Sequence, residues 1–307
     1  MKKDTPIYAT ADLHIRDSKP ACWDTLEHFM DHQTDMLEQI KKMVGDRVLL
    51  VAGDLFHSAQ PSIECLSYAI SHLPENVFAI PGQHDLLNHN YETRLNETGF
   101  GLLEKMGRIR SVDTPRGISF DDYQITGTPW RMDDNVALSS DNFCIHLRHK
   151  YIWKNGESTP KQLQADSTHI SEICLTEKEK GLRFDLVIYG DNHEWFFGQN
   201  VINCGAPTIQ NCDRRHVQLG IWKITTKQWT HQLLEPTLKG LRDTNEEPSV
   251  LSSGIDEAVE KLIMSAKQQK IIIDTDFLHK LEDFIVKERV KKEVAETIRK
   301  ICKEFET

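Results

Sequence analysis

Residues 7–14 read IYATADLH, residues 48–54 read VLLVAGD and residues 77–85 read VFAIPGQHD. Each stretch begins with a short apolar run and ends in a loop that carries carboxylate, imidazole or amide groups. Short apolar runs bounded by polar or glycine-containing loops are typical of buried strands. The sequence therefore predicts three strands whose ends carry groups that can ionise or bind a metal.

Apolar residues at helical spacing fill the two intervals between these strands, at Leu26 to Val44 and at Ile63 to Leu73. Alternation of strand and helix predicts parallel β-α-β units and an α/β fold. Later strands, some close enough for antiparallel pairing, are expected at Tyr123–Thr126, Phe143–Ile145, Leu186–Tyr189, Val201–Cys204, Val217–Ile224 and Trp229–Leu234.

Composition suggests a division of the chain into four parts. We expect a core at 1–198, a β-rich completion of that core or a capping element at 199–235, and a linker at 236–254. The remaining part, 255–307, is predicted to form helices at Ile255–Ala266 and Thr275–Phe305. These amphipathic helices either fold back on the core or bind a partner.

The overall charge and hydropathy exclude some classes of protein. The formal net charge of −10 argues against a broadly basic nucleic-acid binder. It does not exclude a nuclease, because bound divalent cations reverse the potential in a carboxylate-lined site. No apolar run approaches the ~18 residues of a membrane span, and no secretory signal is evident. The seven cysteines are expected to be reduced, and the protein to be cytoplasmic with no membrane association.

The polar groups at the strand ends predict a metal site. Asp12 and His14 are two residues apart on an extended strand end, so both side chains can reach one ion. Asp54, on the next strand, could bridge two ions with its two oxygens. A single such residue is more often a cap or a loop hydrogen bonder. However, His146 and the stretch 190–193 place further groups after later strands, and the carboxyl edge of an open α/β sheet is where ligands bind.

The ordered series of motifs resembles that of the calcineurin-like metallophosphoesterases from Ile7 to about His193. The stretch 53–62 and the loop Gly205-Ala206-Pro207 are similar to those of the DNA double-strand-break repair nucleases of the SbcD type. The resemblance implies a four-layer α/β/β/α sandwich with a small β-rich extension and a helical C-terminal segment. It also implies two divalent metal ions.

The resemblance also implies a role for each motif residue. One ion would be held by Asp12, His14, Asp54 and His193, and the other by Asp54, Gln83, His146 and Asp191. His84 would stabilise the scissile phosphate or protonate the leaving oxygen. His57 would help to position a DNA end, and Asp85 would orient or tune a neighbouring group.

Two residues depart from the family pattern. Gln83 stands where the family has asparagine, and Asp191 stands where the family has the first histidine of its last motif. Both still offer an oxygen, so the second site is expected to prefer Mn²⁺ or Mg²⁺. Mn²⁺ is the favoured metal overall, with Mg²⁺ or Fe²⁺ as alternatives.

The function expected from this resemblance is hydrolysis of DNA phosphodiester bonds, by an exonuclease or endonuclease of DNA repair or recombination. An SbcC-type coiled-coil ATPase would bind the C-terminal segment, and the chain could form a homodimer through one of its two N-terminal helices. Two alternatives remain open. The first is a phosphatase or phosphodiesterase for a small molecule or phosphoprotein. The second is an inactive scaffold that binds DNA or an ATPase, which the changes at Gln83 and Asp191 would explain.

Overall fold

A computed structural model describes most of the first 242 residues of the chain. The described residues are 5–120, 122–133, 136–137, 142–154, 168–169, 184–210 and 218–242. The chain divides into two units, 1–244 and 245–307, and the following account concerns the first. Most of the predicted linker and all of the predicted helical segment 255–307 lie outside the described residues.

Two six-stranded sheets form the body of this unit. In spatial order, the first sheet contains β14 (Trp229–Leu233), β13 (Gly220–Ile224), β1 (Ile7–Thr10), β2 (Val48–Ala52), β3 (Asn76–Ile80) and β4 (Arg110–Ser111). The second contains β11 (Phe196–Gly198), β12 (Val201–Asn203), β10 (Leu186–Gly190), β7 (Phe143–His149), β6 (Tyr123–Thr128) and β5 (Ile118–Phe120). A separate pair is formed by β8 (Ile152–Trp153) and β9 (Thr168–His169).

The central strands of both sheets run parallel. β1, β2, β3 and β4 pair in this way in the first sheet, and β6, β7, β10 and β12 do so in the second. The two sheets pack face to face through a buried apolar cluster, to which Ile7 and Leu50 contribute from one side and Ile145 and Leu147 from the other. The carboxyl ends of the central strands are thereby brought to one end of the sandwich.

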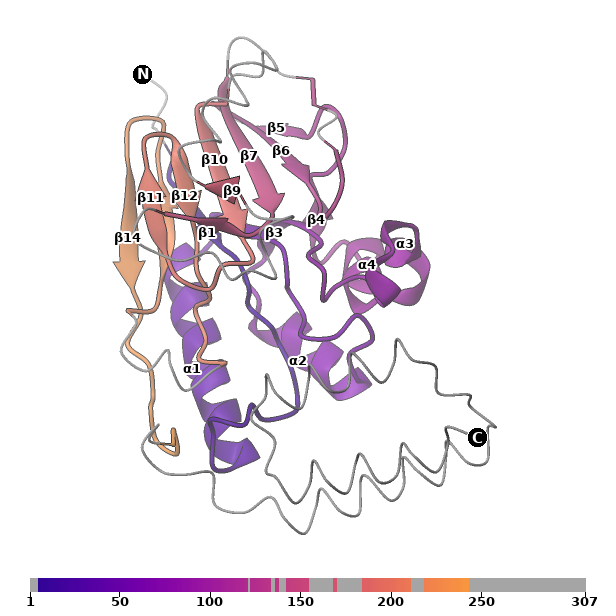
Figure 1. Ribbon diagram of the computed structural model, residues 1–307, viewed down its shortest axis with the longest axis vertical. Helices are drawn as coiled ribbons and strands as arrows, with labels where there is room; N and C mark the ends of the chain where they lie inside the picture. The colour runs from indigo at the N-terminus through magenta and orange to yellow at the C-terminus, as the bar shows by residue number, and fades with distance from the viewer. Residues whose placement is uncertain are drawn as a thin grey trace, which may run out of the picture. The chain divides into compact units, whose positions relative to one another are not determined.

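Two helices, α1 (Leu26–Val44) and α2 (Ile63–His72), cover the outer face of the first sheet (Figure 1). Thr25 caps the start of α1, because its hydroxyl accepts a hydrogen bond from the His28 backbone N–H. Gly45, with a φ of 61°, caps the end. Ser62 caps α2 in the same way through the Cys65 N–H. The periodic apolar residues of α1, including Phe29 and Ile40, are buried against the sheet.

Shorter helices follow β3: η1 (Leu87–His89), η2 (Tyr91–Thr93), α3 (Arg94–Glu97) and α4 (Gly99–Lys105). The α/β sandwich predicted from the sequence is confirmed, and its three strands and two helices near the N-terminus form where expected. The described residues supply an α/β/β arrangement. The stretches 155–167 and 170–183, which precede β10, lie outside them, so the predicted fourth layer is not described.

The segment 199–235 adds strands to both sheets. β12 pairs with β10 in the second sheet, whereas β13 pairs with β1 and β14 in the first. Among the helices that the structure describes, none has the length and apolar character needed to cross a membrane.

Candidate metal centre

The loops that follow β1 and β2 continue the parallel pairing of the two strands. The backbone N–H of Asp12 donates to the Gly53 carbonyl at 3.0 Å, and the N–H of His14 donates to the Asp54 carbonyl at 3.0 Å. These hydrogen bonds satisfy the backbone beyond the strand ends. They also keep the side chains of Asp12, His14 and Asp54 at the same end of the first sheet.

The backbone is left-handed at four of the predicted ligand positions. φ is 53° at Asp12, 44° at His14, 51° at Asp54 and 89° at Asp191. A non-glycine residue in such a conformation costs about 1–3 kcal/mol and persists only where its surroundings impose it. This cost, repeated at four residues that follow three strands, indicates that the loops are shaped for the placement of these side chains rather than for stability.

Five side chains form what we call the carboxyl-edge cluster: Asp12, His14, Asp54, His149 and His193. The donor atoms of Asp12, His14 and His193 lie within 4.8 Å of one another, as do those of Asp12, Asp54 and His149. The Nε2 atoms of His14 and His193 are 3.1 Å apart, and His149 Nε2 lies 3.3 Å from Asp54 Oδ2. Two carboxylates and three imidazoles thus converge on a small volume.

Several polar atoms in and beside this cluster are buried without a hydrogen-bond partner: His14 Nδ1, Asp54 Oδ2, His149 Nε2, His57 Nδ1 and Gln83 Oε1. Buried polar atoms are nearly always hydrogen bonded, so a group of exceptions calls for an explanation. Imidazole nitrogens together with carboxylate and amide oxygens are the ligands that divalent Mn, Fe and Zn accept. The donor set therefore fits a divalent metal.

His149 occupies the position that the sequence analysis assigned to His146, and that assignment is corrected. Successive residues of β7 point to opposite faces of the sheet. His146 pairs with Val187 on the outer face, stacks on Phe184 at 4.3 Å, and lies 2.8 Å from the hydroxyl of Thr126. It does not join the carboxyl-edge cluster.

His149 points to the inner face, because it has the same parity as Ile145 and Leu147 of the inter-sheet core. Its Nδ1 lies 2.7 Å from the Ala52 carbonyl oxygen, so Nδ1 carries the proton and Nε2 faces Asp54. A strand longer than predicted explains the error. The prediction ended β7 at Ile145, whereas the strand continues to His149.

Gln83 and Asp191, the two residues that depart from the family pattern, contact each other. Gln83 Nε2 donates to Asp191 Oδ1 at 3.0 Å, which leaves Gln83 Oε1 buried and without a partner. The backbone N–H of Asp191 donates to both carboxylate oxygens of Asp12, at 3.1 and 3.0 Å. The structure therefore places both departing residues at the cluster, where each contributes oxygen atoms.

His57 and His84 lie beside the cluster, at the side of His14. The rings of His57 and His84 stack with centroids 5.3 Å apart, and the His14 ring is 4.9 Å from that of His84. The backbone N–H of His84 donates to Asp54 Oδ1. The ring Nδ1 of His84 lies 3.0 Å from the His57 carbonyl oxygen. Since a carbonyl only accepts, Nδ1 of His84 carries a proton and Nε2 is left for a ligand.

Arg16 was not singled out in the sequence analysis, yet it lies near His57. Burial first, and then the charge of Arg16, lower the pKa of His57 to about 4. The Arg16 guanidinium donates to the Ser18 hydroxyl at 3.1 and 3.0 Å. Its position two residues beyond His14 is the signal that could have identified it.

Asp85 fixes the backbone of two loops beside the cluster. Its buried carboxylate accepts hydrogen bonds from the backbone N–H groups of Leu55, Phe56 and Gly82, at 3.0, 2.9 and 3.0 Å. It thus ties the loop after β2 to the loop after β3. Burial, with a contribution from Asp54, raises the pKa of Asp85 to about 7. Asp85 thus holds the backbone of these two loops in place.

The charged groups of the cluster shift one another's pKa values. Burial alone would raise the pKa of Asp54, but His149, His14 and His84 outweigh it and lower that pKa. Burial would likewise lower the pKa of His149, yet Asp54, Asp12 and Asp191 raise it well above its usual value. Burial lowers the pKa of His14 and raises that of Asp12. In the metal-free protein the carboxylates thus favour a cation at this position.

Three glycines allow the backbone to contact the cluster directly. A Cβ atom at Gly53 or Gly190 would overlap the ring of His149, and one at Gly82 would overlap the carboxylate of Asp54. The loop Gly205-Ala206-Pro207 packs against the cluster from another side, because the Ala206 N–H donates to the His193 carbonyl at 2.9 Å. The space around the ligands is therefore bounded by backbone.

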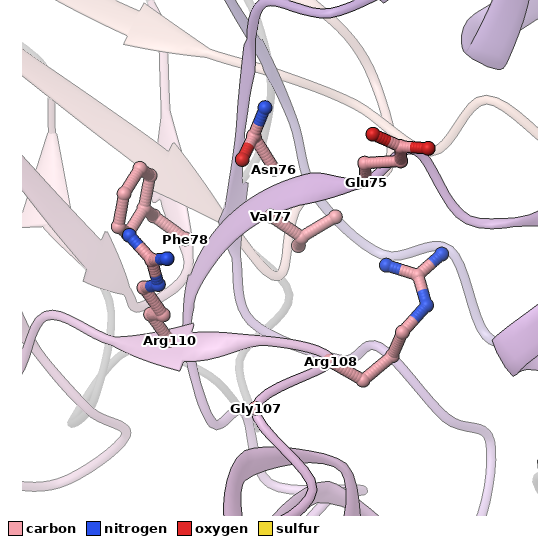
Figure 2. A pocket seen from close by; sticks show the side chains of 7 residues that line it. All are labelled: Glu75, Asn76, Val77, Phe78, Gly107, Arg108 and Arg110. Atoms are coloured by element: carbon pink, nitrogen blue, oxygen red, sulfur yellow. The ribbon is translucent and has the colours of Figure 1, made fainter.

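A shallow pocket at the start of β3 lies at the other end of that strand from Gln83. It is lined by residues that include Glu75, Phe78, Arg108 and Arg110 (Figure 2). Arg110 lies over the Phe78 ring, and Arg108 donates to the carbonyls of Ile70, Leu73 and Pro74. This pocket contains none of the cluster residues.

Comparison with known proteins gives a family for the chain. A model of the calcineurin-like phosphoesterases matches residues 5–195. Matches to solved structures number 112 chains. In one crystal structure the identity is 12% and the TM-score 0.43, and the match covers 75% of this chain and 99% of the other. A novel archaeal phosphodiesterase is 16% identical with a TM-score of 0.36, over 75% of this chain and 100% of its own.

No curated protein matches the chain. The family model nevertheless covers more than half of the sequence, including the loops after β1, β2, β3, β7 and β10 that carry the cluster. The chain belongs to the calcineurin-like phosphoesterase family, whose members are metal-dependent phosphoester hydrolases.

Proposed function

We propose that this protein is a two-metal nuclease that hydrolyses phosphodiester bonds in DNA. The observation that carries the proposal is the group of buried, unpartnered donor atoms at the carboxyl edge. Asp12, His14, Asp54 and His193 would hold one ion. Asp54, Gln83, His149 and Asp191 would hold the other. Ions bound there would supply positive charge to the reacting phosphate and make a water molecule more acidic.

The residues of the chain would divide the remaining work. His84 would present Nε2 to the substrate, because its Nδ1 is engaged with the His57 carbonyl. Protonated on Nε2 as well, it would donate the Nε2 proton to the departing sugar oxygen and be left as the neutral Nδ1–H imidazole. His57, stacked on His84, and Arg16, whose charge acts on His57, would contact the phosphates that flank the scissile bond.

The donor atoms favour Mn²⁺ as the metal, with Mg²⁺ or Fe²⁺ as alternatives. Gln83 and Asp191 provide oxygen to the second site, whereas His14 and His193 provide nitrogen to the first. Mn²⁺ accepts both kinds of donor, whereas Mg²⁺ prefers oxygen. From the sequence resemblance, a coiled-coil ATPase partner for residues 255–307 remains part of the proposal.

Cleavage assays on defined DNA substrates test the proposal. Linear duplex, nicked duplex and single-stranded DNA are incubated with Mn²⁺ and the wild type, Asp54→Ala or His84→Ala, beside a bis-aryl phosphodiester. We expect DNA cleavage that Asp54→Ala abolishes and that His84→Ala slows by about 10²- to 10⁴-fold. His72→Ala, a change on α2 outside the cluster, should leave the rate unaltered.

The outcomes separate the proposal from its rivals. Hydrolysis of the aryl ester without cleavage of any DNA substrate would establish a small-substrate phosphodiesterase instead. Failure to bind Mn²⁺ in a calorimetric titration, together with no hydrolysis, would favour an inactive scaffold. Equal loss of cleavage in His72→Ala would show that the variants act through the fold and not through the cluster.

A further inference from the structure

Three side chains beyond the carboxyl-edge cluster form an arrangement that we call the rim stack: His89, Trp130 and Arg131. The rings of His89 and Trp130 have centroids 5.0 Å apart, and the Arg131 guanidinium lies over the Trp130 ring at 4.3 Å from its centroid. His89 and Arg131 are exposed and Trp130 is half-buried. The rim stack is thus a surface feature and not part of the apolar core.

The rim stack adjoins the proposed second metal site. His89 Nδ1 lies 3.2 Å from the carbonyl oxygen of Gln83, whose side chain contacts Asp191. Trp130 follows β6, and its backbone N–H donates to the Pro81 carbonyl at 3.5 Å. Both contacts are to the loop after β3 that carries Gln83. A group stacked here would therefore be next to a phosphate bound at the cluster.

The backbone of the rim stack is strained in the same manner as the metal centre. Among the described residues, eight non-glycine residues have a positive φ. Four are the ligand positions discussed above. Three more are Asn88, His89 and Arg131, with φ of 51°, 56° and 56°. Such residues gather at functional sites, where surrounding structure holds them.

A half-buried ion-pair network follows the loop that carries His89. Arg94 is paired with Asp113 and with Glu104, and the Tyr91 hydroxyl donates to Asp113. Asp113 follows β4, so the network ties η2 and α3 to the edge of the first sheet. Such contacts restrain the segment just after His89, and restraint before binding lowers the entropy cost of ordering a site.

We propose that the rim stack binds an unpaired nucleobase of the substrate, adjacent to the scissile phosphate. This inference rests on the proposed nuclease function. Aromatic rings and guanidinium planes are the side chains on which unpaired bases stack, and they accept any base because every base has a π-face. Arg131 covers one face of the indole, so the base stacks on the outer plane of the guanidinium or on the exposed His89 ring.

The test compares two single strands that differ only in their bases. Binding of oligothymidylate and of an abasic strand of equal length is measured by fluorescence anisotropy, in Ca²⁺ so that cleavage is slow. The two strands carry the same phosphates, so their affinity ratio reports base contacts alone. We expect the wild type to favour oligothymidylate by about 5- to 100-fold, the range of one base–aromatic stack.

Variants assign this preference to the rim stack. Trp130→Ala should bring the affinity ratio close to one, and Trp130→Phe should retain part of the preference. Trp229→Ala is the matched control, because Trp229 is also half-buried but lies on β14, an edge strand of the first sheet, opposite Ile224 of β13. Its ratio should equal that of the wild type. Thermal denaturation confirms that each variant is folded, and Arg131→Ala replaces Trp130→Ala if the latter unfolds.

Each result decides the matter. A wild type without base preference, or a preference that survives in Trp130→Ala and Arg131→Ala, overturns the rim-stack proposal whether or not the protein cuts DNA. Loss of the preference in the variants, in a wild type that cuts no DNA, leaves the base subsite standing and refutes the nuclease.

Discussion

The buried histidines of the carboxyl-edge cluster differ from His32, which is buried on α1. Both ring nitrogens of His32 are hydrogen bonded: Nδ1 lies 3.0 Å from the Thr237 carbonyl oxygen, and Nε2 accepts the Ile209 N–H at 3.1 Å. In the cluster, His14 Nδ1 has no hydrogen-bond partner, and His149 Nε2 makes no hydrogen bond but faces Asp54 Oδ2 at 3.3 Å. All three rings are almost wholly inaccessible to solvent.

This difference shows what each region is built for. A buried polar atom without a partner costs about 1–3 kcal/mol, and a partner is readily provided where stability alone matters, as at His32. The cluster concentrates such atoms and adds left-handed backbone at Asp12, His14 and Asp54. Asp54 Oδ2, His149 Nε2 and Gln83 Oε1 are donors that divalent ions accept, so bound metal accounts for their lack of hydrogen bonds.

The largest expected effect separates two histidines of β7. His149→Ala removes a proposed metal ligand. It should lower the affinity for the more weakly bound Mn²⁺ by more than about 100-fold, because loss of a residue that only supports a ligand already costs about 10- to 100-fold. His146→Ala, on the outer face, should leave metal affinity unchanged. Isothermal calorimetry with Mn²⁺ measures both. Similar losses in the two variants would contradict the comparison between partnered and unpartnered histidines.

The same two residues show how far the sequence could predict the site. The strand-end positions of Asp12, His14, Asp54 and the 190–193 motif follow from apolar runs that stop at polar loops, and the structure brings these residues together. The choice between His146 and His149 depends on strand phase. Alternation from Ile145 and Leu147 could have identified His149, but only with knowledge that the strand continues to that residue.

Other features were beyond sequence reasoning because they depend on contacts between distant segments. The hydrogen bond from Gln83 to Asp191 joins residues 108 positions apart. The role of Asp85 arises from three backbone N–H groups in two loops. Short elements such as β5 and α4 contain too few periodic residues to be predicted. α1 contains 19 residues, about five helical turns, and was predicted to its ends.

A second prediction concerns the partnered histidine. Burial lowers the pKa of His32 to about 4 from a usual value of 6.5, against a smaller opposing effect of its contact with Thr237. The unfolded chain therefore takes up a proton at His32 below pH 6.5, whereas the folded protein does not until about pH 4. The free energy of unfolding should fall by about 2–3 kcal/mol across this interval on account of His32.

Urea denaturation of the wild type and of His32→Gln at several pH values measures this contribution. The variant is expected to be less stable at pH 7 but to lose less stability between pH 6.5 and 4. Parallel pH profiles in the two proteins would show that His32 is not held neutral by its surroundings.

The smallest expected effect concerns the charge beside the cluster. Arg16 lies near His57, whereas the charged neighbour of His32 is Asp35, which favours its protonated form. If Arg16 contacts a substrate phosphate, Arg16→Gln should weaken DNA binding a few-fold at low salt. It should also reduce the slope of log affinity against log salt by about 0.9. Lys19→Gln, on the same loop, serves as the control; an unchanged slope in Arg16→Gln would remove Arg16 from the DNA-binding residues.

The glycines that contact the cluster have a consequence for the way such a site can diversify. At Gly53, Gly82 and Gly190 the neighbouring backbone touches a ligand with no side chain between them. A larger residue cannot replace any of these glycines without displacing its neighbours, so the size of the pocket cannot be adjusted at these positions. Room for variation is therefore left at the donor side chains themselves, such as Gln83 and Asp191. Exchange of one donor atom for another, on a fixed backbone frame, would be the way to alter the metal preference of such a site.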